Sequence, residues 1–339
     1  MTMIARRQFV KAVAALSIAS PIIACRESAG PQHLSARVPA RRDTVRIPVA
    51  GSFLAADVYT PESAQPGARL PAVVVAGSLT SVKEQMGGIY AAEMAQLGFL
   101  AVSIDYRNYG ASGGSVRQFE DPESKAADLS AAVDYLSARD DVTADRIALL
   151  GVCTSGGTVL YTAARDRRVH AVASVASHFA EPAVTPGLYG GVEGVERRRA
   201  AAREAAEVYR RTGENSMIPA YSDVDQAASH PGPNEYYMDA ARGGGVREWR
   251  NEFSVMSWGP WLAFDPVAQA PRVTVPALIV HSDECALPGQ ARKVYDILSG
   301  PKRVHWSTGP HFEFYDGPDK VREAADVVGE HFTASPGRA

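Results

Sequence analysis

The chain of 339 residues is long enough for one large domain or two ordinary ones. Hydrophobic residues make up 46% of it and charged residues 22%, proportions that indicate a globular protein rather than a disordered or fibrous one. The formal net charge of −3 at pH 7 argues against nucleic acid as a partner, because proteins that bind nucleic acid usually carry a basic surface.

The first 25 residues have the pattern of an export signal. Arg6 and Arg7 fit a twin-arginine signal, and the uncharged stretch 12–24 that follows is too short to span a bilayer. The stretch ends in "IIAC", which resembles a bacterial lipoprotein cleavage box with Cys25 as the lipidated residue; the alternative is an exported protein in which Cys25 is incidental. Residues 26–42 are predicted to be a polar tether. We therefore expect a periplasmic or cell-surface protein with a possible lipid anchor to the membrane.

Strand patterns and helical patterns alternate from residue 43 onward. Two short strands joined at Gly51 form an opening hairpin. Further strands are expected at 70–77, 99–106, 146–152, 169–176, 275–281 and 302–307, and helices at 84–97, 121–138, after 156, at 289–298 and at 319–332. This alternation predicts an α/β fold with a mostly parallel central sheet flanked by helices.

The alternation stops between residues 180 and 270. A charged helical stretch at 195–211 is followed by a loop rich in Pro, Asn and Gly. Since a structureless loop of this length is improbable, we predict a helical cap inserted into a core formed by 43–179 and 271–339. The insertion carries an aromatic cluster: Tyr236, Tyr237, Trp249, Phe253, Trp258, Trp261 and Phe264.

The stretch "RIALLGVCTSGG" has the pattern of a strand that turns sharply into a helix and presents a nucleophile. Such a turn needs small residues two positions before and two after the nucleophile. Cys153 is flanked in this way by Gly151 and Ser155, and Ser155 by Cys153 and Gly157. Because the apolar run 147–150 must end before the bend, we favour Cys153 at the apex. The alternative is a buried structural cysteine, although the helix N-terminus that follows would stabilise a thiolate.

The other members of a catalytic triad are expected later in the chain, with the acid before the histidine. Asp283 and Glu284 follow the strand 275–281; we favour Asp283 as the acid and keep Glu284 as the alternative. His311 follows the last strand, where it can reach the nucleophile across the carboxyl edge of the sheet.

An oxyanion hole needs two backbone donors near the nucleophile. We expect one from Thr154 and the other from Ser78, with Leu79 as the alternative, in the loop after the strand 70–77. Lys83 and Glu84 in the same loop form either an ordinary ion pair or a functional feature. We predict neither a metal nor a cofactor.

Three features together resemble the α/β-hydrolase fold superfamily over residues 43–339: "GVCTSGG", "DYRNYGASGG" and the Cys–Asp–His order. A cysteine in the sharp turn is similar to dienelactone hydrolase. "AGSLTSVKEQ", "GGGVREWRNEF" and "GPHFEFYDGP" resemble a bacterial and fungal branch related to polyketide transferases. The resemblance implies acyl transfer through a covalent acyl-enzyme. The chain departs from the common Gly-x-x-Asp pattern at the acid, where it has Ser282-Asp283-Glu284-Cys285.

These observations predict an exported hydrolase of esters, thioesters or lactones that uses Cys153, His311 and Asp283. The substrate is expected to be a small acyl compound, apolar or aromatic if the aromatic cluster lines the site rather than forming the core of the cap. The alternatives are an acyltransferase with the same mechanism, a non-catalytic binding protein on the same fold, and a redox pair of Cys153 with Cys285, which lacks C-x-x-C spacing.

Overall fold

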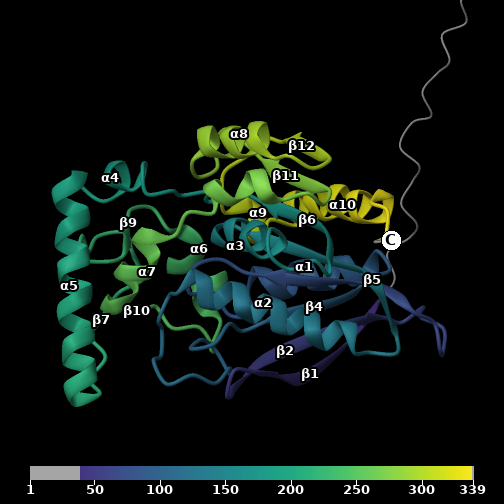
Figure 1. Cartoon of the computed structure of the whole chain (residues 1–339), viewed down its shortest axis with the longest axis horizontal. Coiled ribbons are helices and arrows are strands. Elements are labelled where there is room, and N and C mark those ends of the chain that lie inside the picture. The colour runs from purple at the N-terminus through teal and green to yellow at the C-terminus, as the bar shows by residue number, and fades with distance from the viewer. Residues whose placement is uncertain (1–38, 338–339) are drawn as a thin grey trace, which may run out of the picture. The chain divides into compact units, whose positions relative to one another are not determined.

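The computed structural model describes residues 39–337, and an eight-stranded sheet lies at its centre (Figure 1). The strand order is β1-β2-β4-β3-β5-β6-β11-β12. Antiparallel pairing is confined to β1 with β2 and β2 with β4, and the remaining neighbours in this sheet pair in parallel. The strands are β1 (Ala40–Val49), β2 (Ser52–Pro61), β3 (Leu70–Ala76), β4 (Leu100–Ile104), β5 (Val142–Val152), β6 (Val169–Val175), β11 (Ala277–His281) and β12 (Lys302–Trp306).

Helices cover both faces of the sheet, which explains why its inner strands are continuous apolar runs. Alternate residues of β3 enter different layers: Val73 and Val75 pack with α1 (Met86–Gln96) and α10 (Pro318–Ala334). Ala72 and Val74 belong to the opposite layer. That second layer contains α2 (Pro122–Ser137), α3 (Thr154–Ala163) and α8 (Pro288–Ile297). The predicted α/β fold with helices on both faces is therefore confirmed.

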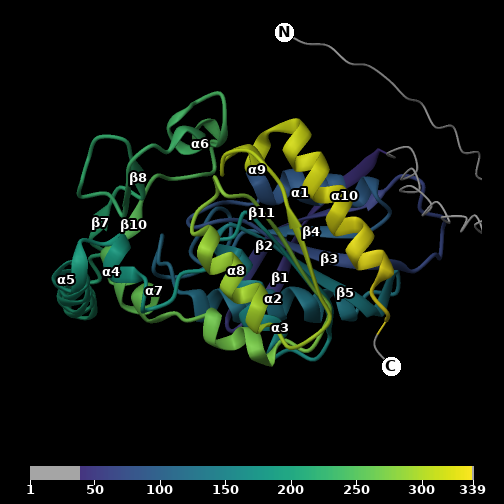
Figure 2. The same cartoon turned by 90° about the horizontal axis from the view of Figure 1, so that it is seen from above.

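The segment between β6 and β11, residues 180–270, is called the cap below. Its long helix α5 (Gly191–Thr212) lies at the far edge from α10 (Figures 1 and 2) and buries only small residues and Val195. Most of its charged side chains are exposed, whereas Arg198 turns inward and donates to the Tyr189 carbonyl at 2.9 Å. The rest is less helical than the predicted helical cap, because short helices alternate with two small strand pairs. These elements are α4 (Thr185–Leu188), β7 (Met217–Ile218), β8 (Tyr221–Ser222), β9 (His230–Pro231), α6 (Glu235–Met238), β10 (Phe253–Ser254) and α7 (Trp258–Ala263), with 3-10 turns at Gly243–Gly245, Val255–Ser257 and Val267–Arg272.

Two boundaries differ from those expected. Strand β1 begins at Ala40, three residues inside the segment predicted as a tether, because Ala40 to Arg42 pair with the end of β2. Helix α3 begins at Thr154 rather than after Gly156. The predicted signal, Cys25 and most of the tether lie outside the described residues. Within residues 39–337, no helix has the length and apolar character needed to cross a membrane.

Candidate active site

Cys153 occupies the tight turn between β5 and α3, called the elbow below. Its φ of 55° and ψ of −119° lie in a region that non-glycine residues rarely adopt, so the backbone is strained there. Hydrogen bonds to the β6 side hold the strained peptide: the Cys153 amide donates to Val175 at 3.0 Å, and the His178 amide donates to the Cys153 carbonyl at 3.1 Å. The structure thus places Cys153 at the apex of the turn.

Ser155 has a structural position inside the first turn of α3. Its hydroxyl donates to the carbonyl of Gly77 and lies 2.9 Å from the hydroxyl of Tyr106. A Cβ on Gly151 would lie 2.5 Å from the Ser155 carbonyl carbon, so this close approach requires glycine. The hydroxyl of Ser155 therefore connects the elbow to the loop after β3 and does not occupy the apex.

The Cys153 thiol is almost completely enclosed, with 7% of the residue exposed. Burial raises the pKa of the thiol to about 12, although hydrogen bonds from the Tyr315 hydroxyl and the Thr154 amide act in the opposite direction. The helix N-terminus does contribute the expected stabilisation of a thiolate, but desolvation outweighs it. In this closed arrangement the resting Cys153 side chain is a neutral thiol at neutral pH.

Tyr315 lies between the predicted nucleophile and the predicted histidine. It belongs to α9 (Glu313–Asp316), its hydroxyl contacts the Cys153 thiol, and the same hydroxyl is 3.1 Å from Nε2 of His311. Burial lowers the pKa of His311 to about 3, so the imidazole is neutral at rest. Tyr315 is not among the residues predicted from the sequence, although its position four residues after His311 is a spacing that can bring two side chains together in a helical turn.

Neither predicted acid reaches His311. A backbone amide, that of Ala286, donates to Nδ1 of His311 at 3.3 Å, where a triad carboxylate would instead accept a hydrogen bond from the ring. The carboxylate of Asp283 is 68% exposed and instead binds Arg292 at 2.7 Å and Nε1 of Trp306 at 3.1 Å. This geometry corrects the assignment of Asp283, because its charge is neutralised at the surface by a guanidinium.

The alternative acid is also displaced from the histidine ring. Glu284 is exposed and accepts the amide of Gly309 at 3.1 Å. Its carboxylate thus fastens the loop that carries His311 without contacting the imidazole. The structure brings Cys153 and His311 together through Tyr315 and leaves the acid position to a peptide amide.

The predicted oxyanion loop lies beneath the cap. Ser78 is fully buried, and its hydroxyl contacts the hydroxyl of Tyr237, a cap residue. Tyr221 stacks on Tyr237 with ring centroids 3.8 Å apart and donates to the carbonyl of Leu79 at 3.2 Å. Thr154 carries the first amide of α3, which has no intrahelical acceptor. The candidate donors therefore meet where cap tyrosines close over the elbow.

The Lys83–Glu84 pair belongs to a buried network that shapes the oxyanion loop. The Lys83 ammonium also lies 3.9 Å from Asp57 and 4.0 Å from Asp105. The Asp105 carboxylate accepts the amides of Lys83 at 2.7 Å and Ala111 at 2.9 Å. These contacts hold the loop after β3 against β2 and the "DYRNYG" segment, which is a structural role.

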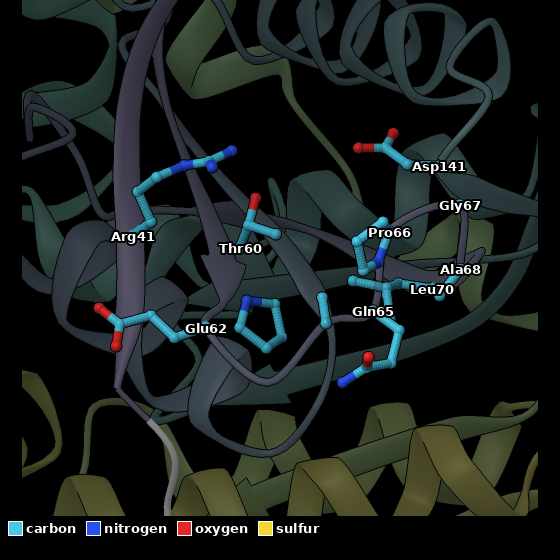
Figure 3. Close-up of a pocket in the computed structure, with 11 residues that line it drawn as sticks. Arg41, Thr60, Glu62, Gln65, Pro66, Gly67, Ala68, Leu70 and Asp141 are labelled. Carbon is cyan, nitrogen blue, oxygen red and sulfur yellow. The ribbon is translucent and has the colours of Figure 1, made fainter.

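A separate cavity of about 470 Å³ lies near the amino ends of β3 and β5, at the opposite end of these strands from Cys153 (Figure 3). Leu70 and Asp141 line it where β3 and β5 begin, whereas Cys153 follows the end of β5. Because active sites of open α/β sheets form at the carboxyl ends of strands, we do not assign this cavity to the reaction. Its lining also includes Arg41, Thr60, Glu62, Gln65, Pro66, Gly67 and Ala68.

The sheet order, the strained elbow after β5 and the histidine after the last strand define an α/β-hydrolase. The chain belongs to the X-Pro dipeptidyl-peptidase (S15) family, whose profile matches residues 50–313. It is 30% identical over 300 residues to the protein PA2218 of Pseudomonas aeruginosa, covering 85% of this chain and 79% of that one. The crystal structure of PA2218 has a TM-score of 0.75 at 26% identity and covers 89% of this chain and 95% of its own.

Two further proteins bear on the predicted resemblance. The thiohydrolase aneE of Aspergillus aculeatus is 27% identical over 258 residues, which cover 70% of this chain and 76% of that protein. The dienelactone hydrolase of Anabaena variabilis has a TM-score of 0.53 at 16% identity, covering 88% of this chain and 100% of that one, and so shares the fold. The resemblance to α/β-hydrolases is thus confirmed, and the chain belongs to a family of hydrolases and related acyltransferases.

Proposed function

We propose that this chain hydrolyses an ester, thioester or lactone through a covalent acyl-enzyme on Cys153. The observation that carries the proposal is the position of the thiol: it lies at the apex of a strained elbow and is linked through Tyr315 to His311. Strain of this kind gathers at active sites, where the surrounding structure maintains it. The similarity to a thiohydrolase supports thioesters as the first substrates to examine.

The reaction begins with attack of the Cys153 sulfur on the substrate carbonyl. As the carbon–sulfur bond forms, the thiol proton passes to the oxygen of Tyr315, whose own proton moves to Nε2 of His311. Amides of Thr154 and of Ser78 or Leu79 stabilise the oxyanion. The leaving group takes the proton back as its bond to the carbonyl breaks. Water then attacks the acyl-enzyme by the same route and releases the acid and the free thiol.

This proton transfer requires a lone pair on Nε2 of His311, so the resting proton of the ring must lie on Nδ1. In the closed structure the Ala286 amide donates to Nδ1, which favours the opposite tautomer. The ring, or the segment that carries Ala286, must therefore shift before reaction. The Tyr315 hydroxyl, which donates to the Cys153 sulfur at rest, must also turn its proton toward Nε2. We propose that substrate entry, which must also displace the cap tyrosines, accompanies this shift.

The test is the intact mass of the folded protein after incubation with a panel of esters, thioesters and lactones. We expect an acyl adduct on Cys153 and its loss, with loss of turnover, in Cys153→Ala. Cys285→Ala is the matched control, because Cys285 is also a buried free thiol but lies in the segment after β11. Full turnover by Cys153→Ala would refute the assignment, and loss confined to Ser155→Ala would transfer it to Ser155.

Acyl transfer to a nucleophile other than water is the second candidate. The observation that favours it is the enclosure of the thiol, since a closed site keeps water from the acyl-enzyme. Addition of amines, thiols and alcohols to the preformed acyl-enzyme separates the two outcomes. Faster decay with transfer of the acyl group indicates a transferase, and decay to the free acid at an unchanged rate indicates a hydrolase.

The amino-terminal pattern leads to a separate proposal on location. We propose export by the twin-arginine route and lipidation at Cys25, on the basis of Arg6, Arg7 and the cleavage-box pattern. Expression in a bacterial host followed by fractionation and mass spectrometry tests both steps. Arg6→Lys combined with Arg7→Lys should abolish export, and Cys25→Ala should leave an exported protein without the lipid mass.

A further inference from the structure

Aromatic side chains from the core and the cap form an enclosure on the β6 side of Cys153. The enclosure consists of His178, Tyr221, His230 and Trp261. The rings of His178 and Trp261 are near parallel, 22° apart, with centroids 6.1 Å apart, and His230 lies 6.1 Å from Trp261 and 5.6 Å from Tyr221. Both ends of this series reach the nucleophile, because the His178 amide bonds the Cys153 carbonyl and Tyr221 interacts electrostatically with the thiol.

The two histidines of the enclosure are neutral polar groups. Burial lowers the pKa of His178 to about 4 and that of His230 to about 3. Nδ1 of His230 is satisfied by the Ser229 hydroxyl at 3.0 Å. Nδ1 of His178 is buried, and no other residue in the described part of the chain provides a hydrogen-bond partner for it. Since an unmet buried hydrogen bond is unfavourable, this nitrogen is suited to a ligand.

The charges around the enclosure do not favour a cation. Glu120, the acidic residue in electrostatic reach of Tyr221, is already paired with Lys125 at 2.5 Å. Arg198 is in electrostatic reach of His230, where its positive charge opposes a second cation. The carboxylates of Asp283 and Glu284 have partners at the surface. Within residues 39–337, these contacts offer no free carboxylate for the ammonium of a peptide amino terminus.

We infer that the site takes a neutral, planar acyl group that carries a hydroxyl or similar oxygen substituent, and that it rejects peptides with a free amino terminus. The planar part would lie against Trp261, and the oxygen would bond Nδ1 of His178. A hydroxyl suits this nitrogen in either tautomer, because it both donates and accepts. The inference rests on the proposed acyl transfer by Cys153, and it separates this chain from the X-Pro dipeptidyl-peptidase activity after which its family is named.

The experiment compares kcat/KM for matched thioesters of one thiol: acetyl, benzoyl, hydroxybenzoyl, Ala-Pro and N-acetyl-Ala-Pro. We expect kcat/KM for the hydroxybenzoyl thioester to exceed that for the acetyl thioester by about tenfold or more. Because of its free amine, the Ala-Pro thioester should have a kcat/KM about tenfold below that of the N-acetyl-Ala-Pro thioester, as expected for one buried contact. In His178→Phe the ring remains but the nitrogen is lost, so the hydroxybenzoyl to benzoyl ratio should fall about five- to tenfold. Trp261→Ala should lower kcat/KM for both aromatic thioesters relative to that for the acetyl thioester.

His305→Phe is the matched control, because His305 lies in β12 and binds Glu323 at 2.7 Å outside the enclosure. It should leave every ratio unchanged. A preference for free-amine Ala-Pro, or an unchanged hydroxybenzoyl ratio in folded His178→Phe, would overturn the inference. If acyl adducts form on Cys153 but kcat/KM is the same for all the thioesters, the preference for a neutral, planar acyl group is refuted and the proposed acyl transfer stands. If no substrate acylates Cys153, the proposed function is wrong as well.

Discussion

Removal of the Tyr315 hydroxyl is the sharpest test of the proposed proton path. Tyr315→Phe keeps the ring, which packs at 4.9 Å from Tyr236 and 5.2 Å from Phe312, and deletes only the oxygen between Cys153 and His311. The loss of a buried hydrogen bond should lower the free energy of unfolding by about 1–3 kcal/mol. The fold should therefore persist, and the variant can be assayed as a folded protein.

The catalytic effect should be far larger than the effect on stability. Positioned acid–base groups contribute about 10²–10⁴ in rate, so we expect the acylation rate of Tyr315→Phe to fall by about 100-fold or more. The hydroxyl also lowers the pKa of Cys153, and its loss should slow alkylation of the thiol. Single-turnover acylation followed by mass spectrometry gives the first quantity, and alkylation rates between pH 7 and pH 10 give the second.

A half-buried tyrosine of α8 provides the control for this substitution. Tyr295→Phe should change neither rate, because this ring packs against the core layer on the opposite face of the sheet from Tyr315. The proposed path would be refuted by a folded Tyr315→Phe protein that acylates at the wild-type rate, because Cys153 would then reach His311 without the hydroxyl.

Three other predictions follow from the geometry. Gly151→Ala should destabilise the protein by about 3 kcal/mol in urea denaturation, since its Cβ would meet the Ser155 backbone; an unchanged midpoint would contradict the close approach. Asp283→Asn should keep kcat within about twofold, whereas a tenfold or larger loss would mean that this carboxylate acts on His311 during turnover. The pKa values of folded His178 (about 4) and His230 (about 3) lie below the unfolded value of about 6.5, so the unfolded chain binds more protons and Tm should fall from pH 7 to pH 5. Asp105 and Asp128, whose pKa burial raises to about 6, act in the opposite direction, so the measurement compares the wild type with His178→Phe and His230→Phe. An unchanged pH dependence of Tm in both variants would show that these rings are not buried as neutral groups.

The strands of the core could be predicted because their residues are apolar on both faces. The run that ends at Leu150 also located the apex of the elbow, since a strand buried on both sides must stop where small residues begin. The chain order placed His311 after the last strand for the same topological reason. Local pattern and connectivity were sufficient for these features.

The contacts of the site depend on tertiary structure and left weaker signals. Asp283 is adjacent in sequence to the expected position of the acid, but its carboxylate is held by Arg292, nine residues away on α8. Tyr221 lies in a short cap strand outside the aromatic cluster, and only folding stacks it on Tyr237. Tertiary packing decides which side chain neutralises a charge and which ring covers a thiol. The hydrophobic periodicity of the sequence does not encode these contacts.

The burial of Cys153 has a meaning for the lifetime of the protein as well as for its reaction. With a pKa of about 12, the resting thiol is ionised to about one part in 10⁵ at pH 7. Oxidation to sulfenic acid requires an accessible thiolate, so peroxides should spare this cysteine between turnovers. The cap tyrosines that cover the elbow should thus also protect the sulfur from oxidation while no substrate is bound.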